Sequence, residues 1–183
     1  MDYKEGFEDS NWHLIELSKV NDKIISDLVK NINSEISEEF FISFESLIKI
    51  SKEKTHLIKS AVDRIKETED FREIILNYLL KSYNDSIDDK IILKLYNHDF
   101  IVRARTIMEL TESRNLDYIK FILPLLNDPD DSVRWAVLKF IIENNLCENE
   151  NIIKKLIERK KCEGNLIIKR KIQSILKSDP PKF

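Results

Sequence analysis

The sequence predicts an all-α protein built from stacked helix pairs, and three observations support this fold class. An apolar residue followed by Arg recurs at a constant spacing of 31 residues, at Phe71-Arg72, Val102-Arg103 and Val133-Arg134. Apolar residues follow Phe71 and Val133 at helical spacing, at +3, +4, +7 and +8. The 183 residues include two Gly and four Pro, too few for the corners of a turn-rich β fold. A period near 30 residues with a helical apolar pattern is typical of repeat proteins in which each helix pair packs on its neighbours.

The elements follow in order along the chain. Residues 10–18 predict a short N-terminal capping helix with Ser10 as its N-cap. No low-complexity linker divides residues 1–178, so we expect them to form a single domain. The tail 179–183 contains Pro180 and Pro181, which cannot continue a helix, so we expect it to be frayed. Five helix pairs are expected near residues 21–52, 55–81, 86–112, 116–145 and 149–177.

The first helix of each pair, helix A, carries an apolar stripe at i, i+3, i+4 and i+7, so it must pack on a neighbour. Pro124 falls inside the fourth A helix and should kink it, because proline removes one backbone hydrogen bond. The five stripes begin at Ile25, Ile58, Ile91, Ile119 and Ile153.

The second helix of each pair, helix B, repeats the +3, +4, +7 and +8 frame, which begins at Phe40 in the first pair. Phe140 occupies the +7 position of the fourth copy and should be buried. The third copy departs from the frame, since Arg105, Thr106 and Glu109 stand where other copies carry apolar residues. Its core side is therefore the least apolar of the five.

The turns between the two helices of a pair are short and polar. Asp131 or Ser132 is expected to cap the fourth B helix. The last A–B connection is expected to be longer than the others, with Gly164 as a helix break.

Two segments resemble a HEAT repeat. The first comprises residues 125–141, LLNDPDDSVRWAVLKFI, and has an apolar A helix, an Asp-rich turn, a Val-Arg pair and a small residue three positions on. The second comprises residues 95–110, LYNHDFIVRARTIMEL, and is similar but lacks the Pro. The resemblance implies a right-handed α-solenoid of about five helix pairs. It also implies an internal ladder between neighbouring repeats, because a half-buried Arg needs a carboxylate partner. The residues implied for this ladder are Asp99, Arg103, Asp130 and Arg134.

Several classes of site are excluded by the motifs. Cys147 and Cys162 are the only cysteines and form no CxxC pair, so neither a disulfide framework nor a zinc cluster is expected. The three histidines are far apart in sequence, and the two glycines build no phosphate-binding loop. We therefore expect no catalytic residue, no metal and no cofactor.

The chain is expected to be cytoplasmic. The first residues lack a basic segment followed by an apolar run, so no signal peptide is expected. No stretch approaches the ~18 uninterrupted apolar residues of a membrane span.

The outward side of the B helices is the candidate binding surface. In a HEAT-like stack these helices line the concave face, and an apolar centre with a polar rim is typical of a binding hot spot. Leu76, Ile107 and Leu138 share one offset, so they alternatively seal adjacent B helices together. Trp135 varies between repeats, with Glu73 and Ala104 at equivalent positions, which favours a contact role. The candidate partner-binding residues are Glu73, Leu76, Asn77, Ile107, Met108, Trp135, Leu138, Lys139, Ile142 and Arg170.

The charges are unevenly distributed. Residues 1–153 carry 20 Lys and Arg against 30 Asp and Glu, whereas residues 154–183 carry 10 against 3. This asymmetry indicates a polarised partner surface. The alternative is that solvated helix faces differ by chance.

We expect a non-enzymatic protein-binding module that acts through its concave face. Small stand-alone HEAT-like chains resemble accessory or inhibitor proteins, and the Lys-, Ile- and Asn-rich composition is similar to that of AT-rich bacteria. The most specific hypothesis is a bacterial immunity protein that neutralises a toxin, because the acidic body would attract a cationic toxin domain.

The alternative hypothesis is a nucleic-acid-binding protein that uses the basic C-terminal repeat. HEAT-like alkylpurine DNA glycosylases combine an aromatic cleft with a catalytic Asp, and Asp131 and Trp135 lie one helical turn apart here. The acidic body and the expected capping role of Asp131 oppose glycosylase activity.

Overall fold

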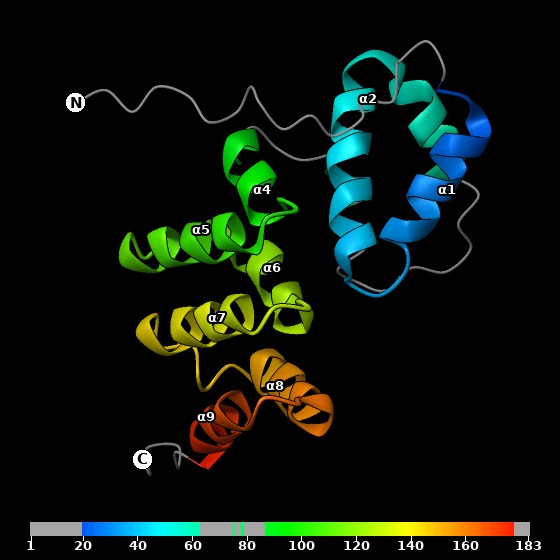
Figure 1. Cartoon of the computed structure of the whole chain (residues 1–183). Coiled ribbons are helices and arrows are strands. Elements are labelled where there is room, and N and C mark those ends of the chain that lie inside the picture. Colours follow the sequence, from blue (N-terminus) through cyan, green and yellow to red (C-terminus); the bar gives the residue numbers. More distant parts are fainter. Residues whose placement is uncertain (1–19, 63–74, 76–77, 79–86, 178–183) are drawn as a thin grey trace.

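The computed structural model describes residues 20–62, 75, 78 and 87–177, and every regular element in this part of the chain is a helix (Figure 1). The predicted all-α class is therefore confirmed for it. The predicted capping helix at 10–18 and the tail 179–183 lie outside the described residues, as does most of the second B helix.

Helices α1 (Asp22–Ile32) and α2 (Glu38–Val62) form the first packed pair. The first-repeat core positions Phe40, Phe44 and Leu47 are fully buried, as the helical frame predicts. Helix α2 continues across the predicted boundary between residues 52 and 55, so that boundary is wrong. The boundary segment holds Lys and Glu, which favour helix, and neither Gly nor Pro to end it.

The remaining elements form three further pairs. Helices α5, α7 and α9 lie side by side, with α5 packed on α7 and α7 on α9 (Figure 1). The A-side elements α4, α6 and α8 lie along the other side of this row (Figure 1). Their bounds are α4 (Asp89–Leu95), α5 (Phe100–Glu112), α6 (Ile119–Ile122), α7 (Asp131–Glu143), α8 (Glu150–Cys162) and α9 (Leu166–Lys177).

Pro124 changes the type of helix in the fourth A segment. Helix α6 ends at Ile122 and continues as the 3-10 helix η3 (Leu123–Asn127), with Pro124 in its first turn. The predicted kinked α-helix is thus a short α-helix followed by a 3-10 helix. The first turn of η3 tolerates the missing N–H of proline, because that position has no obligatory helical acceptor.

Two buried arginines connect consecutive helix pairs. Arg103 on α5 donates from Nε and Nη2 to the carboxylate of Asp128, both at 2.8 Å. Arg134 on α7 donates from the same two atoms to Glu163, at 2.9 and 3.0 Å. Each arginine therefore ties its B helix to the acid in the turn of the following pair.

Asp99 and Asp130, which the resemblance implies as ladder acids, have a different role. They are the N-caps of α5 and α7, and each carboxylate accepts a hydrogen bond of 2.8 Å from a backbone N–H two residues on. Their oxygens satisfy helix-start donors, so the ladder uses Asp128 and Glu163 instead. The cap of α7 is thus Asp130, and the prediction of Asp131 or Ser132 is wrong.

The last A–B connection is shorter than predicted. It spans only 163–165, because α8 ends at Cys162 and α9 begins at Leu166. Gly164 does not adopt a positive φ, and a Cβ added there would meet no atom within 4 Å. A glycine is therefore not required for this turn.

Candidate functional site

The solvent-facing side chains of α5, α7 and α9 form a surface that we call the B-helix face. Trp135 on α7 lies on it and is 41% exposed. At the equivalent positions, Ala104 on α5 is half-buried and Arg170 on α9 is exposed. Trp135 is therefore a large aromatic side chain at a position that the helix packing does not enclose.

Two predicted contact residues belong to the core. Ile107 and Leu138 are buried at equivalent positions of α5 and α7, two helices that pack on each other. Their side chains pack adjacent B helices together and do not contribute to a binding surface. This is the alternative that their shared position in the sequence period predicts. Glu73, Leu76 and Asn77 lie outside the described residues.

The other described candidate residues lie on α5, α7 and α9. Met108 and Ile142 are half-buried, and both pack against the core from the outside. Lys139, one turn after Trp135, is half-buried and forms an ion pair with Glu143 at 3.6 Å. The centre of the B-helix face is therefore apolar with charged groups beside it, an arrangement typical of protein interfaces.

Four exposed apolar residues at the starts of two B helices were not predicted from the sequence. Phe100 and Ile101 on α5 are 41% and 55% exposed, and Leu166 and Ile167 on α9 are both 67% exposed. They flank the helix that carries Trp135. The sequence signal is a pair of large apolar residues directly before the helical frame begins, where two polar residues would be ordinary.

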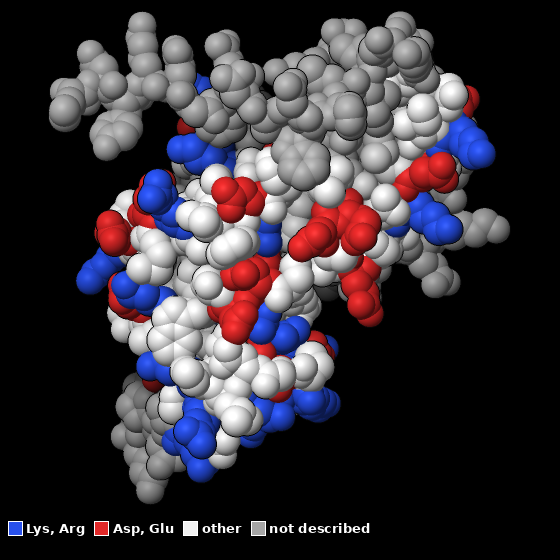
Figure 2. Space-filling view, viewed as in Figure 1, with Lys and Arg blue, Asp and Glu red and all other residues white. Residues whose placement is uncertain are grey.

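The described surface is polarised in charge. Figure 2 shows acidic side chains gathered over the start of α2 and basic ones over α8 and α9. Glu35, Glu38 and Glu39 are exposed at the acidic end, and the last turn of α8 carries Arg159, Lys160 and Lys161.

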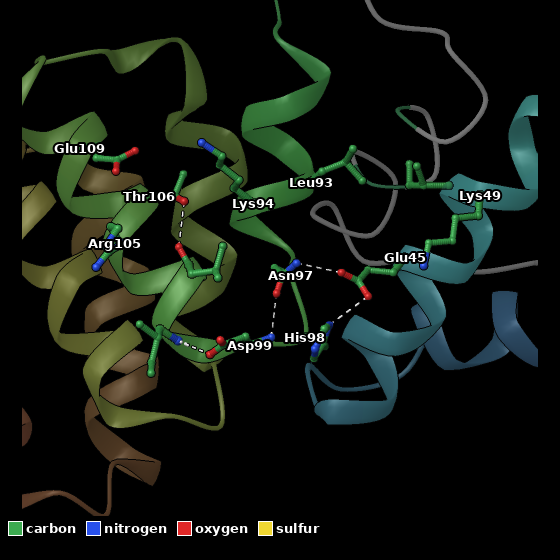
Figure 3. Close-up of a pocket in the computed structure, with 13 residues that line it drawn as sticks. Glu45, Lys49, Leu93, Lys94, Asn97, His98, Asp99, Arg105, Thr106 and Glu109 are labelled. Atoms are coloured by element: carbon green, nitrogen blue, oxygen red, sulfur yellow. Dashed lines mark hydrogen bonds and ion pairs between the residues drawn. The ribbon is translucent and has the colours of Figure 1, made fainter. Parts of the chain in front are cut away.

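A groove of about 630 Å³ lies between α2 and α5, and we call it the α2–α5 groove (Figure 3). Its described walls come from α2, α4, the 97–99 turn and α5. Glu45 reaches from α2 to this turn and accepts hydrogen bonds from Asn97 Nδ2 at 2.9 Å and His98 Nδ1 at 3.1 Å (Figure 3). These two contacts fix the distance between the walls.

The α2–α5 groove follows the flank of α5 that carries the unusual polar residues of the third copy. Arg105, Thr106 and Glu109 line it (Figure 3). Their equivalents on α7, 31 residues on, are Ala136, Val137 and Phe140, which are all buried. The polar residues of the third copy thus lie on a flank of α5 that borders a groove. The equivalent flank of α7 is buried against other parts of the protein.

The pKa values of the two ladder acids are shifted in opposite directions, although burial acts to raise both. At Glu163, burial acts to raise the pKa, but hydrogen bonds from Arg134, the Asn165 N–H and Arg159 outweigh it and hold the pKa at about 2. At Asp128, burial prevails over the bonds from its single arginine and raises the pKa. Glu163 has a second arginine beside it, whereas the neighbouring Asp130 carboxylate adds to the rise in the pKa of Asp128. Both acids serve the ladder.

The described part of the chain holds no group of three or more His, Cys, Asp and Glu side chains placed to bind a metal ion. None of its helices combines the length and apolarity that crossing a bilayer requires. Asp131, the glycosylase candidate, is exposed and accepts a hydrogen bond from Asn165 Nδ2.

No protein family, curated protein or solved structure matches this chain.

Proposed function

We propose that this chain is a non-enzymatic protein-binding module with a HEAT-like solenoid architecture. The side-by-side packing of α5, α7 and α9 supports the architecture. So do the equivalent contacts of Arg103 and Arg134, which lie one sequence period apart. Stacked helix pairs of this kind present an extended row of B helices, and such rows commonly serve as binding surfaces.

The observation that carries the proposed function is the exposure of Trp135 at the centre of the B-helix face. An exposed tryptophan loses apolar hydration only when a partner covers it, and tryptophan is enriched in interface hot spots. Ile101 and Ile167, on the two flanking helices, extend the apolar surface to either side. Because helices pack about 8–10 Å apart, these three helices offer a surface about 20 Å wide.

A toxin inhibitor is the specific form of this function that we propose. The exposed acids at the start of α2 would attract a cationic toxin domain and accelerate its encounter with the protein. The B-helix face would then supply the apolar contacts that slow dissociation. Fold alone does not identify the partner, so this form rests on the charge distribution.

Affinity purification from the source cells followed by calorimetric titration of the recovered partner tests the proposal. Trp135→Ala should weaken binding by about 2 kcal/mol or more, the usual size for an interface hot spot. Ile157→Ala is the matched control, because Ile157 on α8 is 45% exposed but lies outside the B-helix face. Unchanged affinity in a folded Trp135→Ala protein would reject the B-helix face as the binding surface.

A nucleic-acid-binding function is the second candidate, and the basic surface over α8 and α9 favours it (Figure 2). If it is correct, a fluorescent DNA duplex should bind with an affinity that falls steeply from ~50 to ~200 mM salt. Lys160→Glu with Lys161→Glu should weaken this binding, and Trp135→Ala should not. Absence of binding at low salt would exclude it.

A further inference from the structure

We propose that residues 158–171, which we call the α8–α9 corner, contact an anionic membrane surface, with Leu166 and Ile167 among the lipid headgroups. The corner lies at the end of the helix row farthest from α5 (Figure 1). The inference does not depend on the proposed function, because Trp135 takes no part in it. Three observations lead to it, namely an exposed apolar pair, the positive charge around this pair and the hydrogen-bonded backbone of the turn.

The apolar pair projects from the corner. Leu166 and Ile167 are both 67% exposed, the highest fraction among the large hydrophobic residues of the described chain. Gly164, in the turn before them, is also exposed, and a Cβ added to it would meet no atom within 4 Å. The start of α9 therefore faces open solvent, and its two aliphatic side chains lose their water only when another surface covers them.

The charges around the pair indicate an anionic surface. Residues 158–171 carry six Lys and Arg against two Glu, and the basic side chains gather over α8 and α9 (Figure 2). Through hydrogen bonds, α7 adds one charge of each sign. Arg134 donates to Glu163. Asp131 accepts from Asn165. These groups leave a surplus of four positive charges, which attracts anionic lipids.

The start of α5 shows that an exposed apolar pair alone does not bring such a surplus. Phe100 and Ile101 are the first two residues of α5, as Leu166 and Ile167 are of α9. The α2–α5 groove, which Ile101 lines, holds as many cations as carboxylates, namely Lys49, Lys94 and Arg105 against Glu45, Asp99 and Glu109. The apolar pair of α5 is therefore a matched control for that of α9.

The cations of α9 lie one helical turn behind the apolar pair. Arg170 follows Leu166 by four residues, on the same side of the helix. Lys171 has the same relation to Ile167. One turn is about 5.4 Å long, and apolar side chains of interfacial helices enter the boundary between headgroups and acyl chains by about 5–10 Å. Entry of the apolar pair would thus place both cations at the level of the lipid phosphates.

The backbone at the start of α9 is already hydrogen-bonded. Asn165 Oδ1 accepts from the N–H groups of Ile167 at 2.9 Å and Ile168 at 3.3 Å. The Asn165 N–H donates to the Glu163 carboxylate at 2.8 Å. Because these donors are satisfied within the chain, moving the corner out of bulk water costs less than it would for a bare helix start.

The aliphatic character of the pair favours a membrane over other anionic partners. Nucleic acids are bound through their phosphates, base edges and stacked bases, which offer little to Leu or Ile. Protein hot spots are enriched in Trp, Tyr and Arg, whereas Leu is under-represented in them. Aliphatic side chains flanked by Lys and Arg are typical of segments that lie in the membrane interface.

Vesicle flotation tests the proposal. At about 100 mM salt, the full chain should bind phosphatidylcholine vesicles that contain about 30 mol% phosphatidylglycerol, and it should not bind pure phosphatidylcholine vesicles. Leu166→Ser with Ile167→Ser should weaken binding at least about tenfold, because it removes the apolar contact. Lys161→Glu with Arg170→Glu should weaken it similarly, because both side chains are exposed on the corner. Phe100→Ser with Ile101→Ser should stay within about twofold of the unaltered protein, since no charge surplus brings that pair to the lipids.

The opposite outcomes reject the membrane contact. Absence of binding to the anionic vesicles, or equal binding to both kinds of vesicle, would overturn it. So would undiminished binding of the Leu166→Ser, Ile167→Ser protein, because the corner would then be a surface for polyanions such as nucleic acid. An equal loss in the Phe100→Ser, Ile101→Ser protein would reject the corner as the site. Vesicle binding is measured without a partner protein, so its failure leaves the proposed function intact. Circular dichroism verifies that each variant is folded.

Discussion

Arg103 and Arg134 lie 31 residues apart and make the same set of contacts. Each donates from Nε and Nη2 to one buried carboxylate. Each also donates from Nη1 to the backbone carbonyls five and six residues earlier, at 2.7–2.9 Å. Arg103 differs in one respect, since its guanidinium lies 3.8 Å from the centre of the Phe41 ring. The two segments, one sequence period apart, thus share a bonding pattern as well as a helix length, since α5 and α7 each have 13 residues.

Removal of a ladder arginine should strongly destabilise the fold. Arg103→Ala should lower the free energy of unfolding by about 3–5 kcal/mol, because it leaves the Asp128 carboxylate buried without its partner. Urea denaturation of both proteins measures the difference. Arg105→Ala, two residues along the same helix and exposed, should change it by less than about 0.5 kcal/mol. Equal losses in the two variants would show that the destabilisation does not come from the ion pair between Arg103 and Asp128.

The capping assignment predicts different effects at two adjacent aspartates. Asp130→Ala should cost about 1 kcal/mol of unfolding free energy, because it removes the acceptor for the Ser132 N–H at the start of α7. Asp131→Ala, in the exposed first turn, should cost less than about 0.5 kcal/mol. Thermal melts compare the two. A larger loss at Asp131 would contradict the observed cap.

Core and surface positions of α7 should respond differently to truncation. Leu138→Ala should cost about 2–5 kcal/mol and Phe140→Ala about 3–5 kcal/mol, as for other buried side chains. Trp135→Ala should cost less than about 1 kcal/mol, because its side chain is already partly solvated. Guanidinium denaturation measures all three. A Trp135 loss as large as that of Phe140 would place its side chain in the core.

Acid should destabilise the C-terminal pair through Glu163. The pKa of Glu163 is lowered from 4.5 to about 2 in the folded protein. Its contribution is therefore fully present above the unfolded pKa and is lost as the pH falls from about 4.5 towards 2. The raised pKa of Asp128 acts in the opposite direction, since its protonation favours the folded state.

Glu163→Gln isolates this effect. It should lower stability at neutral pH and should flatten the loss of stability between about pH 4.5 and 2. Urea unfolding over a series of pH values measures both. A variant with the same acid profile as the unaltered protein would show that another group causes the acid loss.

The sequence predicted those features that depend on its period. The spacing of Val102-Arg103 and Val133-Arg134 identified both ladder arginines, because equivalent positions in stacked helices have equivalent neighbours. The helical frame identified Phe140 as buried for the same reason. Both are local patterns that repeat along the chain.

Other features depend on contacts that no local pattern encodes. Two acids lie in the turn before α7 and a third begins the helix, and only the structure shows that Asp128 turns inward while Asp130 caps the helix. The α2–α5 groove requires Glu45 and His98 to meet across 53 residues. Glu163 departs from the 31-residue period altogether, so the spacing could not identify it as the partner of Arg134.

The described hydrogen bonds that link the helix pairs from α4 to α9 have a consequence for folding kinetics. Arg103 and Asp128 are separated by 25 residues, Arg134 and Glu163 by 29, and the Asp88 N–H and the Tyr118 hydroxyl by 30. Closing a loop of this length costs little more entropy than closing a hairpin, because the cost rises only with the logarithm of loop length. The part of the chain from α4 to α9 can therefore assemble outward from any one of its pairs, each step requiring only the adjacent segment, whereas the contact between Glu45 and His98 spans 53 residues. Such zipper-like assembly favours rapid folding.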